Sequence, residues 1–344
     1  MKQLSLNSPS LKLKLDGNEL KQPVVLTSLA EGVTTIDAGF NDLSSIPPSL
    51  NEFPNLRIVR LNHNQLDDLP KVLGDLPELR EINASSNPLK RFPQVLLRLP
   101  DLERLHLDQT NLLEIPNEFS PTKLTCLSLA TNTLTTIPDA LFARGNSLRC
   151  LRLNHNQLKS LPATIGNLSA LEELDLSYNQ LESLPDEICQ LKRLRTLHLQ
   201  GNKLLTLPHN FGRLASLRRL TVYENQLTTL PESIGSLTAL EEFDASHNSL
   251  GALPSEIGGW KSLHRLVLSE NQLLSLPPSF CRLPVLTHCF LSRNFLTDLP
   301  VDTSAPEVLP ALRVLDFSHN AFPDGWAPPS AYRHVENVAN AFKS

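Results

Sequence analysis

A period of 23 residues runs through nearly the whole chain and restricts what it can fold into. Four windows align without gaps, and they begin at Leu148, Leu171, Leu194 and Leu217: LRCLRLNHNQLKSLP, LEELDLSYNQLESLP, LRTLHLQGNKLLTLP and LRRLTVYENQLTTLP. Their shared frame is LxxLxLxxNxLxxLPxxIGxLxx. A unit this short cannot bury a core alone, so each copy must stack on its neighbours. The period therefore predicts an elongated solenoid.

The asparagine of the frame marks fourteen copies, with a threonine in the fifth. A buried amide both donates and accepts hydrogen bonds, so we expect this side chain to satisfy backbone groups of neighbouring coils. The predicted structural ladder consists of Asn18, Asn41, Asn64, Asn87, Thr110, Asn132, Asn156, Asn179, Asn202, Asn225, Asn248, Asn271, Asn294 and Asn320.

Each part of the frame predicts one part of a coil. LxxLxL is a short parallel strand with its leucines inside, the Leu-Pro step directs the chain outward, and IGxL closes the coil. A frame of this kind with a period of about 20–29 residues is typical of leucine-rich repeats. We therefore expect an α/β-type solenoid, a leucine-rich-repeat horseshoe with a concave parallel sheet of about fourteen strands and an irregular or 3-10 convex side.

The two ends of the repeat array predict caps. Residues 1–10, in which Leu4 and Leu6 alternate, form an expected N-terminal cap segment, and residues 11–322 form the solenoid. Residues 323–344 form a C-terminal cap, and the spacing of Tyr332, Val335, Ala339 and Phe342 predicts a helix over the open end. We see no linker or second domain and expect a whole protein or a whole domain.

Two irregularities interrupt the period. The ladder steps are 22 and 24 residues on either side of Thr110. A hydroxyl cannot replace both donors of an amide, so we expect a ladder defect there, although neutral replacement in a tolerant coil is an equal alternative. The step before the last copy is 26 residues, which predicts that Val301–Pro310 bulges from the convex side.

Composition excludes several function classes. The net charge of −5 offers no basic surface for nucleic acid. No apolar run approaches the ~18–20 residues needed to cross a bilayer, so no membrane insertion is expected. The first residues, MKQLSL, lack the apolar stretch of a signal peptide, and the five cysteines are scattered through the repeats. These features predict a reduced, cytoplasmic protein.

No catalytic residues, cofactors or metal sites are predicted. The sequence lacks a nucleophile elbow, a phosphate-binding loop and a zinc-protease helix, and an open sheet does not exclude water. Cys126 and Cys150 occupy the same frame position in adjacent copies, with His106 one strand further along. A zinc or redox role for these thiols stays open beside the interpretation that they have no function.

Partner binding is predicted on the exposed strand positions, which lie six, four, two and one residues before each ladder residue. Tyrosine and arginine are enriched in protein interfaces, and Tyr178 and Tyr223 lie two copies apart on this face. A solvated polar face is the alternative. The candidate partner-binding residues are Asp175, Tyr178, His198, Arg219, Tyr223, Glu224, Glu242 and Asp244.

Segments such as LEELDLSYNQLESLPDEICQL and LEEFDASHNSLGALPSEIGGW resemble the intracellular 23-residue repeats of Ras-group leucine-rich-repeat proteins, which include the Shoc-type scaffold. The resemblance covers nearly the whole chain. It implies a non-enzymatic scaffold or adaptor in intracellular signalling, with a small GTPase or a phosphatase subunit as the partner. Two alternatives are a recognition module of a host-directed effector or immune-type sensor, and a structural component of an assembly.

Overall fold

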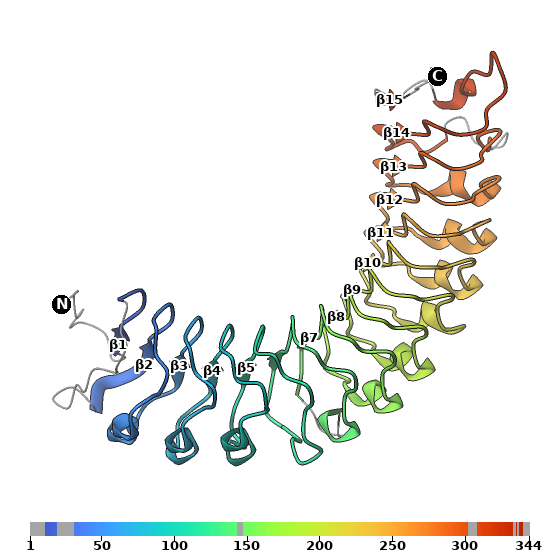
Figure 1. Ribbon diagram of the computed structural model, residues 1–344. Coiled ribbons are helices and arrows are strands. Elements are labelled where there is room, and N and C mark those ends of the chain that lie inside the picture. Colours follow the sequence, from blue (N-terminus) through green and yellow to red (C-terminus); the bar gives the residue numbers. More distant parts are fainter. Residues whose placement is uncertain are drawn as a thin grey trace. The chain divides into compact units, whose positions relative to one another are not determined.

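The computed structural model describes residues 11–18, 31–142, 147–301, 308–332, 335 and 337–339. The expected N-terminal cap at 1–10 and most of the loop expected to bulge, 302–307, lie outside the described residues. Contacts between residues divide the chain into two compact units, Met1–Leu158 and Lys159–Ser344. Figure 1 shows in each unit a row of strands on one side and a row of short 3-10 turns on the other.

Each of the fourteen frame copies contributes one short strand, as expected from its LxxLxL segment. In the first unit these are β1 (Leu11–Lys14), β2 (Val33–Asp37), β3 (Ile58–Arg60), β4 (Glu81–Asn83), β5 (Arg104–His106), β6 (Cys126–Ser128) and β7 (Cys150–Arg152). In the second unit they are β8 (Glu173–Asp175), β9 (Thr196–His198), β10 (Arg219–Thr221), β11 (Glu242–Asp244), β12 (Arg265–Val267), β13 (His288–Phe290) and β14 (Val314–Asp316).

Within each unit, strands that follow one another in sequence pair in parallel, and equivalent frame positions stand opposite one another. Arg219 pairs with Glu242, for example, and Leu220 pairs with Phe243. The middle residue of each strand from β8 to β14 points into the core, as Leu220 and Phe243 do, and is almost fully buried. The leucine rows of the frame are therefore continuous rows of core contacts, and the predicted solenoid is confirmed.

The convex side consists of 3-10 turns, as predicted. Most of them begin directly after the proline of the Leu-Pro step, whose extended backbone directs the chain away from the strand. The turns are η2 (Pro48–Glu52), η3 (Lys71–Asp75), η4 (Gln94–Arg98), η5 (Asp139–Phe142), η6 (Ala163–Asn167), η7 (Asp186–Gln190), η8 (Phe211–Arg213), η9 (Glu232–Ser236), η10 (Ser255–Gly259), η11 (Pro278–Arg282) and η12 (Ser330–Tyr332). No helix in the described part of the chain is long and apolar enough to span a membrane.

The glycine of the IGxL segment allows these turns to stack closely. A Cβ atom on Gly235 would stand 2.1 Å from the backbone oxygen of Glu256 in the next coil. Real Cβ atoms do not approach an oxygen this closely, so a side chain here would force the two turns apart. The glycine in the frame is therefore a packing requirement between coils.

The asparagine ladder is confirmed, and Asn202 shows its geometry. Its Nδ2 donates to the backbone oxygens of Leu176, at 3.0 Å in the preceding coil, and Leu199, at 2.9 Å in its own coil. Its Oδ1 accepts from the backbone N–H of Leu181 at 3.0 Å. One amide thus satisfies backbone groups of two coils, and it is only 7% exposed.

A backbone feature that we did not predict accompanies the ladder. The residue before each ladder residue has a left-handed backbone, with φ between 51° and 68°. Only Gly17 and Gly201 are glycines, and the others are larger residues such as Tyr178 and Glu224. The strain of this conformation is compensated by the ladder hydrogen bonds that follow it, and the turn directs each of these side chains away from the core.

Thr110 causes the expected local defect. Its Oγ1 lies 2.8 Å from the backbone oxygen of Leu107 and 3.0 Å from Asn132 Oδ1. In other copies the backbone N–H two residues after the ladder residue donates to the ladder amide of the next copy. Leu89 holds this position in the copy before Thr110, and its N–H donates instead to the backbone oxygen of Asn87 at 2.9 Å. Lys90 is left-handed beside this altered turn, with φ 62°. The missing amide is thus accommodated by a rearranged backbone.

The predicted C-terminal helix is wrong. Where a helix was expected to begin, Ser330–Tyr332 forms the single 3-10 turn η12, and Asn337–Ala339 forms a further strand, β15, that pairs in parallel with β14. The edge of β14 exposes backbone donors and acceptors that a strand can satisfy and a helix cannot. The apolar residues still cover the core, because Tyr332 and Val335 are buried and the Tyr332 hydroxyl donates to the oxygen of Pro300 at 2.7 Å.

Candidate functional site

The side chains that flank each buried strand residue form an exposed surface on the second unit. In β8, β9, β11 and β13 the first and third residues are half-buried while the middle residue is buried. We call the surface formed by these positions on β8–β14, together with the one or two residues that precede each ladder residue, the open face. All eight predicted partner-binding residues lie on it.

Two tyrosines are joined across the open face. The hydroxyl oxygens of Tyr178 and Tyr223 are 3.3 Å apart, although the residues belong to copies that are not adjacent. The ring of Tyr178 passes over Gly201 of the intervening copy, where a Cβ atom would stand 2.5 Å from the ring. Gly201 therefore makes room for the pair, and 38% of the surface of Tyr178 is still exposed.

The contact changes the chemistry of the second tyrosine. The hydrogen bond with Tyr178, followed by partial burial and the neighbouring carboxylates, raises the pKa of Tyr223 well above its usual range. The Tyr223 hydroxyl therefore stays protonated at physiological pH and is available as a donor or an acceptor.

Two predicted binding carboxylates also stabilise the turns that follow their strands. Oδ1 of Asp175 accepts from the backbone N–H of Ser177 at 3.0 Å and from its hydroxyl at 2.6 Å. Asp244 makes the same two contacts with Ser246, at 3.0 Å and 2.6 Å. In both residues one carboxylate oxygen stabilises the turn, a structural role that was not predicted from the sequence.

Arg219 and Glu242 form a two-point ion pair between β10 and β11. Nε of Arg219 is 2.8 Å from one carboxylate oxygen of Glu242, and Nη2 is 3.4 Å from the other. The hydrogen bond from Arg219 lowers the pKa of Glu242, and the same bond raises the pKa of Arg219. Both side chains are about half exposed, so the pair is in contact with solvent and contributes little to stability.

His198 belongs to a short polar chain on β9 and β10. The Thr221 hydroxyl lies 2.6 Å from Gln200 Oε1 and 2.8 Å from His198 Nδ1. The one proton of the Thr221 hydroxyl is donated to Gln200, so the hydroxyl accepts from Nδ1–H of His198. Glu224, the remaining predicted residue, is exposed on a left-handed backbone beside Tyr223.

A second aromatic contact lies on the open face, outside the eight predicted binding residues. The guanidinium carbon of Arg265 lies 4.7 Å from the centre of the Phe290 ring, a cation–π contact between β12 and β13. Val267 is the register partner of Phe290. In the preceding copies the equivalent frame position is polar, as in Asp175, His198, Thr221 and Asp244, so the change to Val and Phe was the available sequence signal.

On the first unit the equivalent charges neutralise one another. Glu81 is 3.1 Å from Arg60 and 3.3 Å from Arg104, and Asp37 is 3.1 Å from Lys12 and 3.7 Å from Arg60. These ion pairs favour a solvated surface over a partner site on the first unit.

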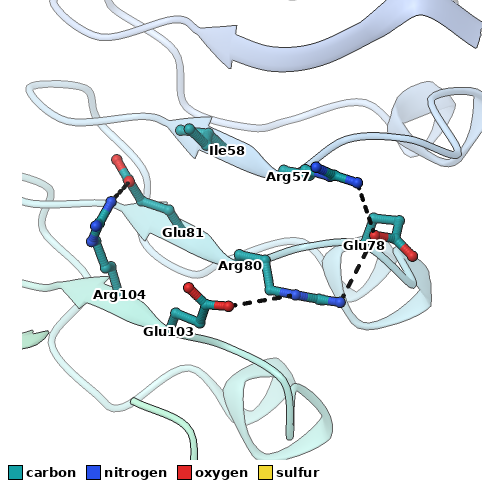
Figure 2. A pocket seen from close by; sticks show the side chains of 7 residues that line it. All are labelled: Arg57, Ile58, Glu78, Arg80, Glu81, Glu103 and Arg104. Carbon is teal, nitrogen blue, oxygen red and sulfur yellow. Dashed lines mark hydrogen bonds and ion pairs between the residues drawn. The ribbon is translucent and has the colours of Figure 1, made fainter. Parts of the chain in front are cut away.

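A shallow hollow of about 430 Å³ lies at the edge of these strands. Figure 2 shows Arg57 and Arg80 directed toward Glu78, and Arg104 directed toward Glu81. The hollow is lined by three arginines, three glutamates and one isoleucine: Arg57, Arg80, Arg104, Glu78, Glu81, Glu103 and Ile58. Equal numbers of paired opposite charges provide no net field for a charged ligand.

Potential metal ligands do not gather in the described part of the chain, where no group of three His, Cys, Asp or Glu side chains could hold an ion. Cys126 and Cys150 are direct register partners on β6 and β7, as expected from their frame position. His106 lies on β5 opposite Ser128, and its burial lowers its pKa.

Comparisons with known proteins agree with this architecture. Models described as leucine-rich repeats match residues 31–89, 100–158, 141–250 and 262–283. A leucine-rich-repeat protein of Leptospira interrogans superposes with a TM-score of 0.81 and 34% sequence identity, covering 88% of this chain and 77% of that one. The chain belongs to the leucine-rich-repeat family.

Other leucine-rich-repeat proteins match over smaller parts of their length. The ectodomain of the Arabidopsis receptor kinase HAESA, solved with an extended IDA peptide hormone, has a TM-score of 0.69 and 30% identity, covering 87% of this chain and 52% of the receptor. Among curated proteins, bovine osteomodulin is 40% identical over 65 residues and rabbit lumican is 44% identical over 57 residues. The chain spans 15% and 30% of the lengths of these two relatives, respectively.

Proposed function

We propose that this leucine-rich-repeat protein is a non-enzymatic scaffold or adaptor that binds a protein partner on the open face of its second unit. The observation that carries the proposal is the Tyr178–Tyr223 pair. Two tyrosines present a large amphipathic area, and their mutual contact and the packing over Gly201 order them before a partner arrives. A pre-ordered aromatic anchor loses little entropy on binding.

The extent of the face favours a protein or peptide over a small molecule. The tyrosine pair begins at β8, and the Arg265–Phe290 contact lies four to five strands further along the same face, on β12 and β13. Strands spaced ~4.8 Å apart place these two anchors on the order of 20–25 Å from each other. A stable protein interface covers about 800 Å² per partner, which fits a surface of this length.

The resemblance to Ras-group repeats suggests the class of partner and the compartment. We propose a small GTPase or a phosphatase subunit as the partner, within cytoplasmic signalling. The HAESA ectodomain was solved with a peptide hormone, which supports a binding role for a repeat surface of this family.

Substitutions taken from other copies of the same frame test the proposal without introducing foreign residues. Tyr178→Gly copies Gly201, and Tyr223→Ser copies Ser246, which stand at equivalent positions. We expect the double variant to lose at least about tenfold in affinity for the partners that the wild-type protein captures from cell lysate, because truncated hot spots cost ~2 kcal/mol or more.

A second variant and a control locate the effect. Arg265→Thr/Phe290→Thr places at both positions the residue that Thr196 and Thr221 provide in earlier copies. Leu205→Ala removes an apolar side chain that is also exposed but lies after its ladder residue, off the open face. The control should keep all partners, and an unchanged partner list for both open-face variants would refute the proposal.

A further inference from the structure

Cys126 and Cys150 lie side by side on the first unit. They are register partners at the first position of β6 and β7, and both are half-exposed thiols. The other three cysteines, Cys189, Cys281 and Cys289, are buried. The chain therefore carries one pair of adjacent, solvent-accessible thiols among the described residues, and the proposed function does not use it.

The sheet geometry brings the two residues to a distance that a disulfide can span. Neighbouring strands lie ~4.8 Å apart, and register partners in a parallel pair project to the same face. Disulfides join residues whose Cα atoms are roughly 4.4–6.8 Å apart. The two Cβ atoms start parallel to each other, so closure requires rotation of the side chains and a small approach of the strands.

We propose that Cys126 and Cys150 form a redox-sensitive dithiol that a low-molecular-weight disulfide, such as glutathione disulfide, converts to a disulfide between β6 and β7. One thiolate attacks a sulfur of the oxidant, forms a mixed disulfide and releases one glutathione thiolate. The second cysteine, as its thiolate, then attacks the protein sulfur of the mixed disulfide and releases the second glutathione. The two protein thiols lose two electrons and two protons, and the oxidant is reduced to two glutathione molecules.

The surroundings favour reaction at this pair over the other cysteines. Cys126 and Cys150 are half-exposed, so an oxidant in solution can reach them. Burial instead raises the pKa of the Cys189 thiol to about 11 and also raises that of Cys289, so these residues stay protonated and inaccessible.

Peptide mapping of the folded, full-length chain tests the proposal. The protein is incubated with glutathione disulfide at neutral pH, alkylated and cleaved with trypsin without reduction. Cleavage after Lys123, Arg144, Arg149 and Arg152 places the two cysteines in the separate peptides 124–144 and 150–152. We expect these peptides to be joined by a disulfide and the intact chain to lose two hydrogens in mass. Dithiothreitol should reverse both changes.

Matched serine variants separate the pair from single reactive thiols. Cys126→Ser and Cys150→Ser should each abolish the linked peptide and leave the remaining cysteine reduced or bound to one glutathione, whereas Cys189→Ser should leave the link intact. Phenylarsine oxide, which bridges two adjacent thiols, should protect Cys126 and Cys150 together from alkylation. The proposal is overturned if the wild-type pair stays reduced, carries two separate glutathiones, or forms links only between two chains.

Discussion

Removal of one ladder amide is the most direct test of how the coils of this protein are held together. In Asn202→Ala the amide disappears from a position that is 7% exposed. The oxygens of Leu176 and Leu199 lose one donor each, but both keep another amide donor, from Asn179 and Asn225 respectively, at 3.0 Å.

The backbone N–H of Leu181 is the group without a replacement partner. It donates to Asn202 Oδ1 at 3.0 Å in the wild-type protein, and alanine provides no acceptor there. A buried donor left unsatisfied costs ~1–3 kcal/mol. We therefore expect Asn202→Ala to lower the free energy of unfolding by about 1–3 kcal/mol. This loss corresponds to one unsatisfied N–H, because the other backbone groups that bond to the amide keep a second partner.

Urea unfolding followed by circular dichroism measures this change. Gln226→Ala is a suitable control, because it removes an exposed amide next to a different ladder residue and should alter stability by less than about 0.5 kcal/mol. A loss in Asn202→Ala no larger than in Gln226→Ala would refute the reasoning, since it would mean that the amide ladder does not stabilise the stack. A changed dependence on urea would instead indicate that coils unfold separately.

Further predictions concern packing and charge. Gly235→Ala should lower the free energy of unfolding in urea by about 1–3 kcal/mol, because the added Cβ collides with the next coil. Gly251→Ala is the control, and it should be neutral or slightly stabilising because its Cβ would meet nothing within 4 Å. Equal effects of the two substitutions would contradict the close-packing argument. In Arg219→Ala the pKa of Glu242 should rise toward its ordinary 4.5, as measured by NMR titration, and an unchanged pKa would contradict the ion pair. Because the folded-state pKa of Glu242 lies below the unfolded one, the stability from this pair is present above pH 4.5 and is lost as the pH falls below it.

The repeated parts of this leucine-rich-repeat fold could be predicted from the sequence because every coil packs on its neighbours in the same way. A frame leucine meets the frame leucine one period away, so one alignment predicts the strands, the register and the ladder together. Even the Thr110 defect could be anticipated, since one hydroxyl cannot replace two amide protons.

The ends of the array could not be predicted in the same way. The spacing of Tyr332, Val335 and Ala339 is helical, but the edge of β14 offers backbone hydrogen bonds to a strand. Tertiary context outweighed local periodicity there, because an exposed sheet edge binds any extended segment that reaches it.

The candidate binding surface could also be predicted only in part from the sequence. The alternation of the frame was sufficient to predict which positions of β8–β13 are exposed, because it depends only on strand geometry. The contacts among those exposed side chains depended on the stacked structure. Tyr178 reaches Tyr223 because the intervening copy has glycine at position 201, and Arg265 covers Phe290 because their strands are adjacent. The repeated frame therefore determines the backbone fold, whereas the contacts of the variable side chains depend on which coils stack beside them.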